Sequence, residues 1–468
     1  MEISALDPTD RFELSNGVHL LVGLTLLLVA TAPVTDLIRT NHLSLAYLVL
    51  IALALGHDAA THDGISSLVV LQVTLVFAIV GLVTALTGGG LGSRRYELGA
   101  VFVCTLLFVL VRDDLPRFGR RGAPYLLAFA ALFGIFLLHS SQYAANTGLA
   151  LFPVFAGILL GLNLFVVPRY VSQDAVYWSM GLIAAGVSFL ALPTAFIGDY
   201  SIGVFEVRTW TNTLPIGDVP VSRSIYANPN TFGLVVFPGI IASAIAVHRT
   251  YTRSRHPGFA TIPLLCFPLT VIGLVLSNSR AAMLAAAIGF GLYVTIKRTG
   301  PGGIPLIMAG TAISVVLFLV AIFSGILPID PANRFALWRA GLLALLSEGS
   351  PLGAGLVGTS ELVEPYLPAG VGTYSVHNSY LSIALRTGFI GGLAYLVLVV
   401  GPLLHSIVRP DRAVRTLGML AIASGFAVHQ LFEAYTLYQF GPGSILGALA
   451  VGYLIESLST PLPRDRPR

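Results

Sequence analysis

A histidine and several arginines in this sequence stand where long hydrophobic runs begin. His377 opens the stretch HNSYLSIALRTGFIGG, Arg280 follows SNS at the start of another run, and Arg223 precedes SIYANPN. Arginine presents a permanently charged planar fork that matches phosphate oxygens, and histidine is the side chain best able to take a proton near neutral pH. A histidine beside two or three arginines would therefore suit a base that activates a hydroxyl while the arginines stabilise a departing diphosphate.

The elements that must position these groups are membrane helices. Of the 468 residues, 55% are hydrophobic and only 10% are charged, whereas a soluble domain has roughly 25% charged residues. We therefore predict an all-α, polytopic integral membrane protein with about 12 to 14 transmembrane helices, in which residues 1–468 form one membrane domain. The formal net charge of +4, from 26 basic and 22 acidic residues, is too small an excess to indicate nucleic-acid binding.

Hydrophobic windows give the expected positions of these helices. A spanning helix needs about 20 mostly apolar residues. The windows are 17–36, 43–56, 65–86, 97–111, 123–139, 149–167, 175–197, 231–248, 259–277, 280–297, 303–325, 379–405, 414–432 and 441–457. The residues before the first window are polar and acidic, so we expect a retained membrane helix there and not a cleavable signal peptide.

Basic residues in the short connections predict the orientation. Positively charged loops tend to stay on the cytoplasmic side, and the basic ones are 112–121, 168–174, 248–256, 297–300, 405–415 and 463–468. The two long connections, 198–230 and 326–378, then lie outside together with His377. Arg94 and Arg95 would also lie outside, against the charge rule. Either the window at 97–111 is not a true span, or these two arginines have a function.

Two explanations apply to the outer arginines. Long basic side chains snorkel to the headgroup layer, so any single interfacial arginine is explained without a site. Several that converge on one face are better explained by a shared cavity. Arg334 and Arg339 in the longer loop would join Arg223, Arg280 and His377 if the loops fold over the helix ends.

The longer outer loop contains a predicted helix, and a second helix start follows the other loop. In the stretch 330–349, Asp330 suits an N-cap and Gly349 a C-terminal stop, with an apolar stripe through Phe335, Trp338, Leu342, Leu345 and Leu346. Asn-Pro-Asn at 228–230 forces a turn, after which Asn230 could cap a helix from Thr231. That helix start would also direct N–H groups and a positive dipole end at an anion, and the two interpretations are compatible.

We expect no metal and no cofactor. The predicted outer loops contain no Asp-x-Asp pair. His57 and His62 have no recognised zinc spacing and are expected to be solvated loop residues. The only cysteines, Cys104 and Cys266, fall in apolar runs and provide no disulfide framework or cysteine-based metal site.

Four motifs together resemble a known family. RSIYANPNTFG (223–233), SNSRAAML (277–284), NRFALWRAGLLALLSEGSPLGAG (333–355) and HNSYLSIALRTGFIGG (377–392), in this order and separated by hydrophobic spans, resemble the O-antigen ligase and O-antigen polymerase family of bacterial and archaeal membrane proteins. The resemblance covers about 200–400. It implies a GT-C-like membrane fold and metal-independent transfer of a glycan from a polyprenyl-diphosphate carrier to an acceptor, at the outer face of the cytoplasmic membrane.

The resemblance also implies roles for individual residues. By motif position, Arg223 and Arg280 bind the diphosphate and His377 is the catalytic base. Arg94 or Arg95 could supply a further basic residue that assists in some members. Asn378 is expected to orient the site or to cap its helix, and Arg334 to support it.

Some alternatives stay open at this point. The acceptor could be a lipid, a glycan or a protein, so a ligase and a polymerase are not distinguished. A transporter or flippase of lipid-linked sugars would also need outward arginines, but would ordinarily place polar groups at the bilayer midplane. Arg386 is the main polar group inside a hydrophobic run, and it either pairs with Glu433 or lines a cavity.

Overall fold

The computed structural model describes residues 121–142, 147–170, 173–202, 205–215, 217–253, 261–324, 326, 333–372, 374–439 and 441–459. The predicted spans 17–36, 43–56, 65–86 and 97–111 lie outside these residues. So do Arg94, Arg95, His57, His62, Cys104 and Asp330.

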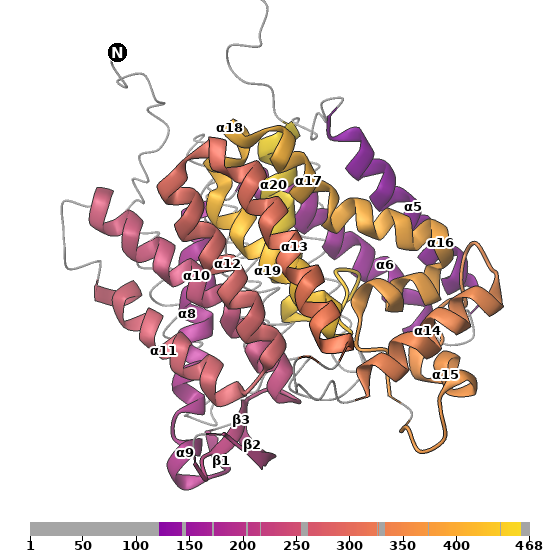
Figure 1. The fold of residues 1–468 in the computed structure, drawn as a ribbon, viewed down its shortest axis with the longest axis horizontal. Coiled ribbons are helices and arrows are strands. Elements are labelled where there is room, and N and C mark those ends of the chain that lie inside the picture. The colour runs from indigo at the N-terminus through magenta and orange to yellow at the C-terminus, as the bar shows by residue number, and fades with distance from the viewer. Residues whose placement is uncertain are drawn as a thin grey trace, which may run out of the picture.

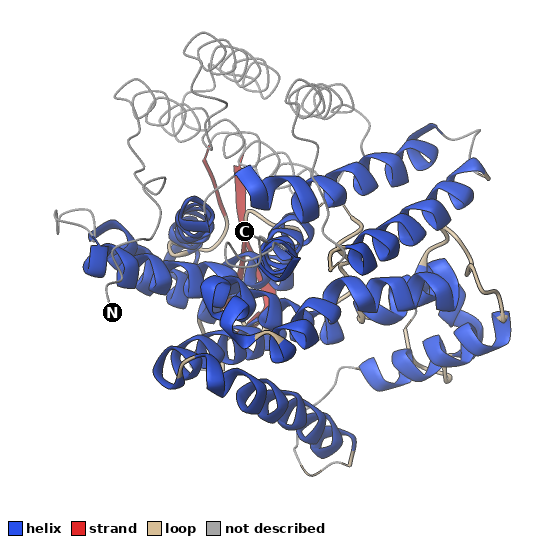
Figure 2. Ribbon diagram, turned by 90° about the horizontal axis from the view of Figure 1, so that it is seen from above, coloured by secondary structure: helices blue, strands red, loops and turns tan. Residues whose placement is uncertain are grey.

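The described chain is a bundle of helices with a small sheet at one end (Figures 1 and 2). The longer helices are α5 (Ala123–Ser141), α6 (Thr147–Gly161), α8 (Gln173–Ala191), α10 (Pro229–Arg253), α11 (Thr261–Ser277), α12 (Arg280–Thr299), α13 (Ile304–Phe323), α14 (Arg334–Glu348), α16 (Ser379–Val399), α17 (Gly401–Val408), α19 (Leu417–Phe432) and α20 (Pro442–Ser459). Shorter pieces are the π-helical turn η2 (Leu162–Val166), α7 (Val167–Tyr170), α9 (Thr194–Ile197), η4 (Pro301–Gly303), α15 (Thr359–Val363), η5 (Glu364–Tyr366), α18 (Pro410–Ala413) and η6 (Val414–Thr416).

Membrane-spanning helices dominate this part of the chain. Within the described residues, 8 segments are long and apolar enough to cross a membrane: Ala123–Ser141, Phe152–Arg169, Val176–Ile197, Pro229–Arg249, Arg280–Thr299, Pro301–Ile322, Ser379–Val399 and Pro442–Ser459. Pro263–Ser277 is a shorter apolar helix. Every predicted window from 123–139 onward coincides with helical structure, which confirms the predicted fold class of an all-α, multi-pass membrane protein.

The spans differ in how deeply they lie in the bundle. The α20 window is 89% buried, whereas the window over η4 and α13 is only 6% buried. Small residues explain the central place of α20, because they let helix backbones approach closely. A Cβ on Gly452 would lie 2.4 Å from the carbonyl oxygen of Asn163 in η2, so no larger residue fits without a shift. Figure 1 shows α13 on the near side of the bundle, in front of α19.

The first long connection contains an antiparallel sheet that the sequence analysis did not predict. Strands β1 (Tyr200–Ile202), β2 (Phe205–Thr213) and β3 (Pro220–Ser224) pair in the order β1-β2-β3, with Tyr200 opposite Val207 and Arg208 opposite Ser224. The β2 sequence FEVRTWTNT is rich in β-branched and aromatic residues, which was the available signal. The Ser224 hydroxyl donates to the carbonyl of Val187 in α8 at 2.7 Å and anchors the sheet to the bundle.

The second long connection contains the predicted helix, with a different start and a different buried face. α14 begins at Arg334, after Asn333, which has a left-handed conformation. As predicted, Gly349 ends the helix, and its φ is 58°. The expected apolar stripe is only partly right, because Leu342 and Leu346 are exposed. The buried face consists of Leu337, Ala340, Ala344 and Leu345. It packs on Leu381 and Leu385 of α16, so small residues set the contact.

Candidate functional site

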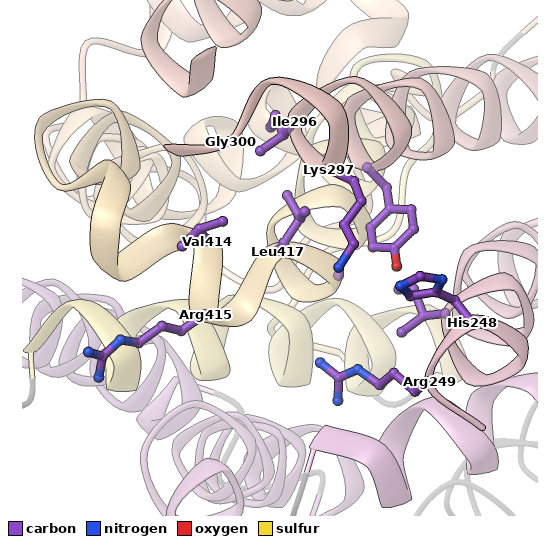
Figure 3. Close-up of a pocket in the computed structure, with 11 residues that line it drawn as sticks. His248, Arg249, Ile296, Lys297, Gly300, Val414, Arg415 and Leu417 are labelled. Carbon is purple, nitrogen blue, oxygen red and sulfur yellow. The ribbon is translucent and has the colours of Figure 1, made fainter. Parts of the chain in front are cut away.

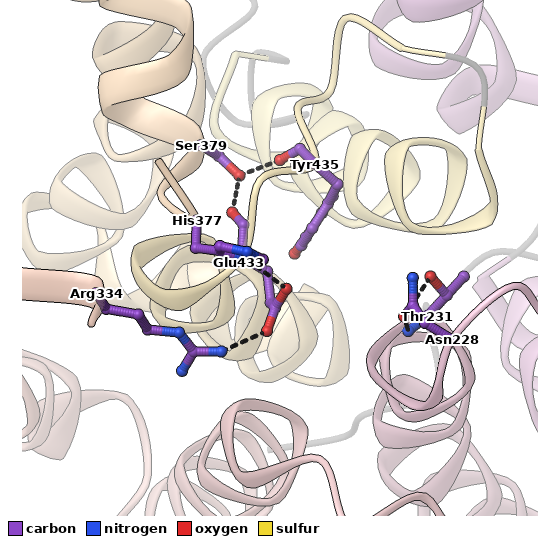
Figure 4. A network of polar contacts seen from close by, with 7 residues as sticks. All are labelled: Asn228, Thr231, Arg334, His377, Ser379, Glu433 and Tyr435. Atoms are coloured by element: carbon purple, nitrogen blue, oxygen red, sulfur yellow. Dashed lines mark hydrogen bonds and ion pairs between the residues drawn. The ribbon is translucent and has the colours of Figure 1, made fainter. Parts of the chain in front are cut away.

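An ion-pair network lies where the second long connection meets α16 and the end of α19 (Figure 4). Glu433 directly follows α19, and its carboxylate accepts a hydrogen bond from Arg334 Nη2 at 2.9 Å. Its second oxygen lies 3.6 Å from Nδ1 of His377. The Glu433 side chain is 11% exposed and that of His377 is 35% exposed. The carboxylate is therefore enclosed while the imidazole keeps an open side.

Helix caps and one serine hold this network in place. Asn378 Oδ1 accepts from the backbone N–H of Leu381 at 3.0 Å, which confirms that Asn378 caps α16. One residue on, the Ser379 hydroxyl donates to the carbonyl of Glu433 at 2.6 Å and also contacts the carbonyl of Tyr435. The residues after α19 are thus tied to the start of α16. This fixes the spacing between the imidazole of His377 and the carboxylate of Glu433.

The arrangement around His377 is that of a base with an orienting carboxylate. With Nδ1 directed at Glu433, the other ring nitrogen, Nε2, is the one left for a substrate. A carboxylate in this place holds the ring and stabilises the imidazolium that forms when the ring accepts a proton. Arg334 in turn holds the carboxylate.

The starts of α10 and α12 form the other half of the site. Asn228 Oδ1 accepts from the backbone N–H of Thr231 at 2.8 Å and from its hydroxyl at 3.1 Å, and α10 begins at Pro229. The predicted cap was wrong by two residues, because the carboxamide of Asn228 reaches the free N–H groups and Asn230 is already helical. The predicted direction of this helix start toward an anion stays a prediction.

Close packing brings Arg280 to the same region as the start of α10. A Cβ on Gly233 in α10 would lie 2.6 Å from Cβ of Ser279, the residue that precedes α12. The two helix starts therefore touch without intervening side chains. Arg280 is the first residue of α12 and is exposed. Arg223, on β3, donates from Nη1 to the carbonyl of Ala227 at 2.9 Å, in the turn that leads into α10.

An apolar cluster links Arg280 to the ion-pair network. Ala281, directly after Arg280, belongs to one buried cluster with Phe432, directly before Glu433. Trp338 of α14 packs on the same cluster, with its ring 6.0 Å from that of Phe432. Arg280 and Glu433 are thus each one residue from the same buried cluster. The structure brings the start of α12 and the His377 network to one end of the bundle, the end that also carries α14, α15 and the sheet (Figure 1).

Backbone strain marks the same positions. Among the described residues, those other than glycine with a positive φ are Ser224 (51°), Asn278 (48°), Asn333 (61°) and His377 (43°). Ser224 directly follows Arg223, and Asn333 directly precedes Arg334. Asn278 lies two residues before Arg280, and His377 is the candidate base itself. Such conformations cost on the order of 1–3 kcal/mol each and cluster at functional sites. Their placement supports one site made from these four segments.

The arginines differ in how their charge is balanced. Arg334 is neutralised by Glu433. Neither Arg223 nor Arg280 forms an ion pair with any residue that the structure describes. Arg223 has only a small electrostatic effect on the carboxylate of Asp199. The pKa of Asp199 is lowered mainly by hydrogen bonds from the hydroxyl and backbone N–H of Thr209, and the charge of Arg223 lowers it less. Within the described residues, the charges of Arg223 and Arg280 are therefore left uncompensated, whereas Arg334 is held by Glu433; anion binding by Arg223 and Arg280 stays a prediction.

The sequence analysis did not predict the contacts of Glu433 with Arg334 and His377. It names Glu433 only as one possible partner of Arg386, whereas the carboxylate of Glu433 lies against Arg334 and His377. Nε of Arg386 is buried without a hydrogen-bond partner. No group of three His, Cys, Asp or Glu side chains in the described ranges is arranged to hold a metal. Metal independence stays a prediction.

The fold and this site define a multi-pass membrane protein with a histidine, a carboxylate and arginines gathered at one end of its helices. Residues 265–396 match the family model for O-antigen ligase. This match supports the family resemblance stated from the motifs. The matched segment contains Arg280, Arg334 and His377, whereas Arg223 and Glu433 lie outside it. No curated protein matches the chain.

Proposed function

We propose that this protein transfers an oligosaccharide from a polyprenyl-diphosphate carrier to an acceptor on the outer face of the cytoplasmic membrane. Membership of residues 265–396 in the O-antigen ligase family implies a glycosyl transfer with a lipid-linked donor and an acceptor in the membrane. The observation that carries the residue assignment is the Arg334–Glu433–His377 network, at the same end of the bundle as the starts of α10 and α12.

In the proposed reaction, Nε2 of His377 takes the proton of an acceptor hydroxyl. The acceptor oxygen forms a bond to the anomeric carbon of the donor sugar, and the bond from that carbon to the diphosphate oxygen breaks. Glu433 stabilises the resulting imidazolium through Nδ1, at a separation of 3.6 Å. Arg223 and Arg280 stabilise the negative charge that develops on the diphosphate. Arginine performs this role here, so the mechanism requires no metal ion.

Reconstitution tests the function. Purified protein in proteoliposomes is given a polyprenyl-diphosphate oligosaccharide and candidate acceptors, without added metal. A longer lipid-linked chain indicates a polymerase, and transfer to a different lipid or protein indicates a ligase. Movement of the donor across the bilayer without transfer would contradict the proposal and favour a transporter.

The base assignment is tested in the same assay. His377→Ala is expected to abolish transfer, with a loss of at least about 100-fold, because general-base catalysis contributes roughly 10²- to 10⁴-fold. His405→Ala is the matched control, since His405 lies on α17 beyond the far end of α16 and bonds to the hydroxyl of Tyr125 at 3.1 Å. Both variants should elute as folded protein in size-exclusion chromatography. Normal transfer by folded His377→Ala protein would rule out His377 as the base.

A further inference from the structure

The ends of the spanning helices mark the two boundaries of the membrane. At one end, His248, Arg249 and Lys297 line a hollow at the last turns of α10 and α12 (Figure 3). Basic side chains gathered at helix ends are typical of a membrane–water interface. α12 has 20 residues and at 1.5 Å per residue spans about 30 Å from this end to Arg280. That length is the hydrocarbon thickness of a bilayer, so Arg280 lies at the opposite boundary.

The kink in α16 marks the same boundary as Arg280. Gly388 divides α16 into the pieces 379–387 and 389–399, and neither is long enough to cross a bilayer alone. The second piece continues into α17, because the N–H of Val400 donates to the helix before it and its carbonyl accepts from the helix after it. Residues 389–408 therefore form one rod of about 30 Å. The membrane crossing starts just after Gly388.

Side-chain exposure agrees with this boundary. The piece 379–387 exposes no large hydrophobic side chain and carries the charge of Arg386. From Phe389 onward, one side of the rod is apolar and exposed, and Leu393 and Leu404 on it are 64% and 58% exposed. Charged side chains collect at the membrane interface, and apolar ones face the acyl chains. The first piece of α16 therefore lies at the headgroup level.

Both ends of α14 contact helix ends at this boundary. At its start, Arg334 bonds to Glu433, the residue directly after α19. After its end, the carbonyl of Pro351 accepts from the N–H of Ile390, just past the kink, at 3.4 Å. α14 therefore extends along the membrane surface and does not cross the membrane. Figure 1 shows it running across the direction of α13.

One face of α14 is apolar and is not covered by any part of the chain that the structure describes. This leucine face consists of Leu342, Leu343 and Leu346, which are 53%, 41% and 67% exposed. The opposite face packs on α16 and α15. Neighbouring exposed apolar side chains mark a contact with a protein or with a membrane. The depth of α14 favours the membrane, because the medium beside a helix at the headgroup level is lipid.

We propose that α14 rests on the membrane leaflet at the His377 end, with its leucine face inserted between headgroups and acyl chains. Amphipathic helices that lie in the interface bury their apolar face to a depth of about 5–10 Å. The lipid contact continues the apolar side of the rod that begins at Phe389. Because α14 starts at Arg334, the helix that holds Glu433 is also the one that lies on lipid. The contact needs no part of the transfer chemistry, so it goes beyond the proposed function.

Fluorescence quenching by labelled lipid tests the proposal. Full-length protein with Cys104→Ser and Cys266→Ser receives one cysteine at a time: Leu346→Cys on the leucine face, Leu393→Cys on the rod, or Glu361→Cys at an exposed position of α15. Figure 1 shows α15 on the side of α14 away from the bundle. Each cysteine is labelled with a nitrobenzoxadiazole maleimide, and the protein is reconstituted into phosphatidylcholine vesicles with or without a nitroxide on the acyl chain.

The three positions are expected to respond differently. Positions 346 and 393 should lose most of their fluorescence to the nitroxide, whereas position 361 should keep most of it. A nitroxide near the headgroup should quench position 346 more than one at the end of the acyl chain, because an interfacial side chain lies only about 5–10 Å deep.

Two results would overturn the proposal. The first is quenching at position 346 that is no stronger than at position 361. The second is crosslinking of Leu346→Cys to itself by a bifunctional maleimide without quenching, which would assign the leucine face to a contact between two copies of the chain. No transfer reaction is measured, so failure of this proposal is distinct from failure of the proposed function.

Discussion

Glu433 contacts both Arg334 and His377 with one carboxylate, and the two contacts have different consequences. The Arg334 contact, at 2.9 Å, is a charge-assisted hydrogen bond that holds the carboxylate still. The His377 contact, at 3.6 Å, is longer than a hydrogen bond and strengthens only when the ring is protonated. Glu433 is therefore matched to the state of His377 after proton transfer. In the proposed reaction it is a positioning residue and not the base.

This role predicts a specific defect for Glu433→Gln. The amide keeps the shape of the side chain but removes its negative charge, so the imidazolium loses its partner. We expect transfer by folded protein to fall by about tenfold or more, because the charge that stabilises the imidazolium in the proposed reaction is lost. Transfer rates of wild type and of Glu433→Gln protein that elutes as folded in size-exclusion chromatography check this effect. Unchanged transfer by the folded variant, or loss of folded protein, would indicate that Glu433 only supports the fold.

For Arg280→Lys we predict a different defect, in the binding of the diphosphate donor. Arg280→Lys keeps one positive charge but loses the planar fork that holds two phosphate oxygens at once. We expect transfer at low donor concentration to fall by about tenfold to 100-fold. Arg339→Lys is the control, since Arg339 is an exposed arginine on α14 with no role in the proposed site. If both substitutions have the same small effect, Arg280 is an interfacial charge and not a diphosphate ligand.

At the scale of elements, α16 is two helical pieces joined at a glycine. Gly388 has a φ of 68° inside α16, and a Cβ there would lie 2.1 Å from the carbonyl oxygen of Pro351. The loop after α14 enters at this kink, where N–H groups of Ala354 and Gly355 donate to carbonyls of α16 at 2.9 Å. The close neighbour of Gly388 is loop backbone, which ties the segment after α14 to the middle of α16.

The kink predicts that Gly388→Ala is strongly destabilising. The new methyl group meets backbone that cannot move aside, and the positive φ is unfavourable for alanine, so we expect a loss of about 2–4 kcal/mol of stability. Gly186→Ala is the matched control, because Gly186 lies within α8 with open space around its Cβ position. There alanine should be neutral or stabilising by up to about 1 kcal/mol. Thermal unfolding in detergent measures both, and equal midpoints would contradict the structural role given to the kink.

At the scale of the whole molecule, the membrane architecture was predictable because hydrophobic length is a local property of the sequence. Windows such as 231–248 and 441–457 coincide with α10 and α20 for this reason. The sheet at β1–β3 was not predicted, since short strands carry a weak local signal beside apolar helices. Motifs pointed to His377 and Asn378 as candidate site residues, and their catalytic roles stay predictions. The pairing of Glu433 with Arg334 was not, because a contact between residues 99 positions apart depends on how α14 and α19 pack.

The orientation of the bundle decides whether the proposed reaction takes place outside the cell, and two single cysteines test it. Both variants also carry Cys104→Ser and Cys266→Ser, so that each has one cysteine. The first carries Thr211→Cys at an exposed position of β2, at the active-site end, and the second carries Arg298→Cys at an exposed position of α12, at the opposite end. The basic loops at the Arg298 end predict that it faces the cytoplasm. A membrane-impermeant maleimide should therefore label position 211 in intact cells and position 298 only after permeabilisation. The reverse pattern would place His377 and Glu433 on the cytoplasmic side, where no acceptor of the proposed kind would reach them.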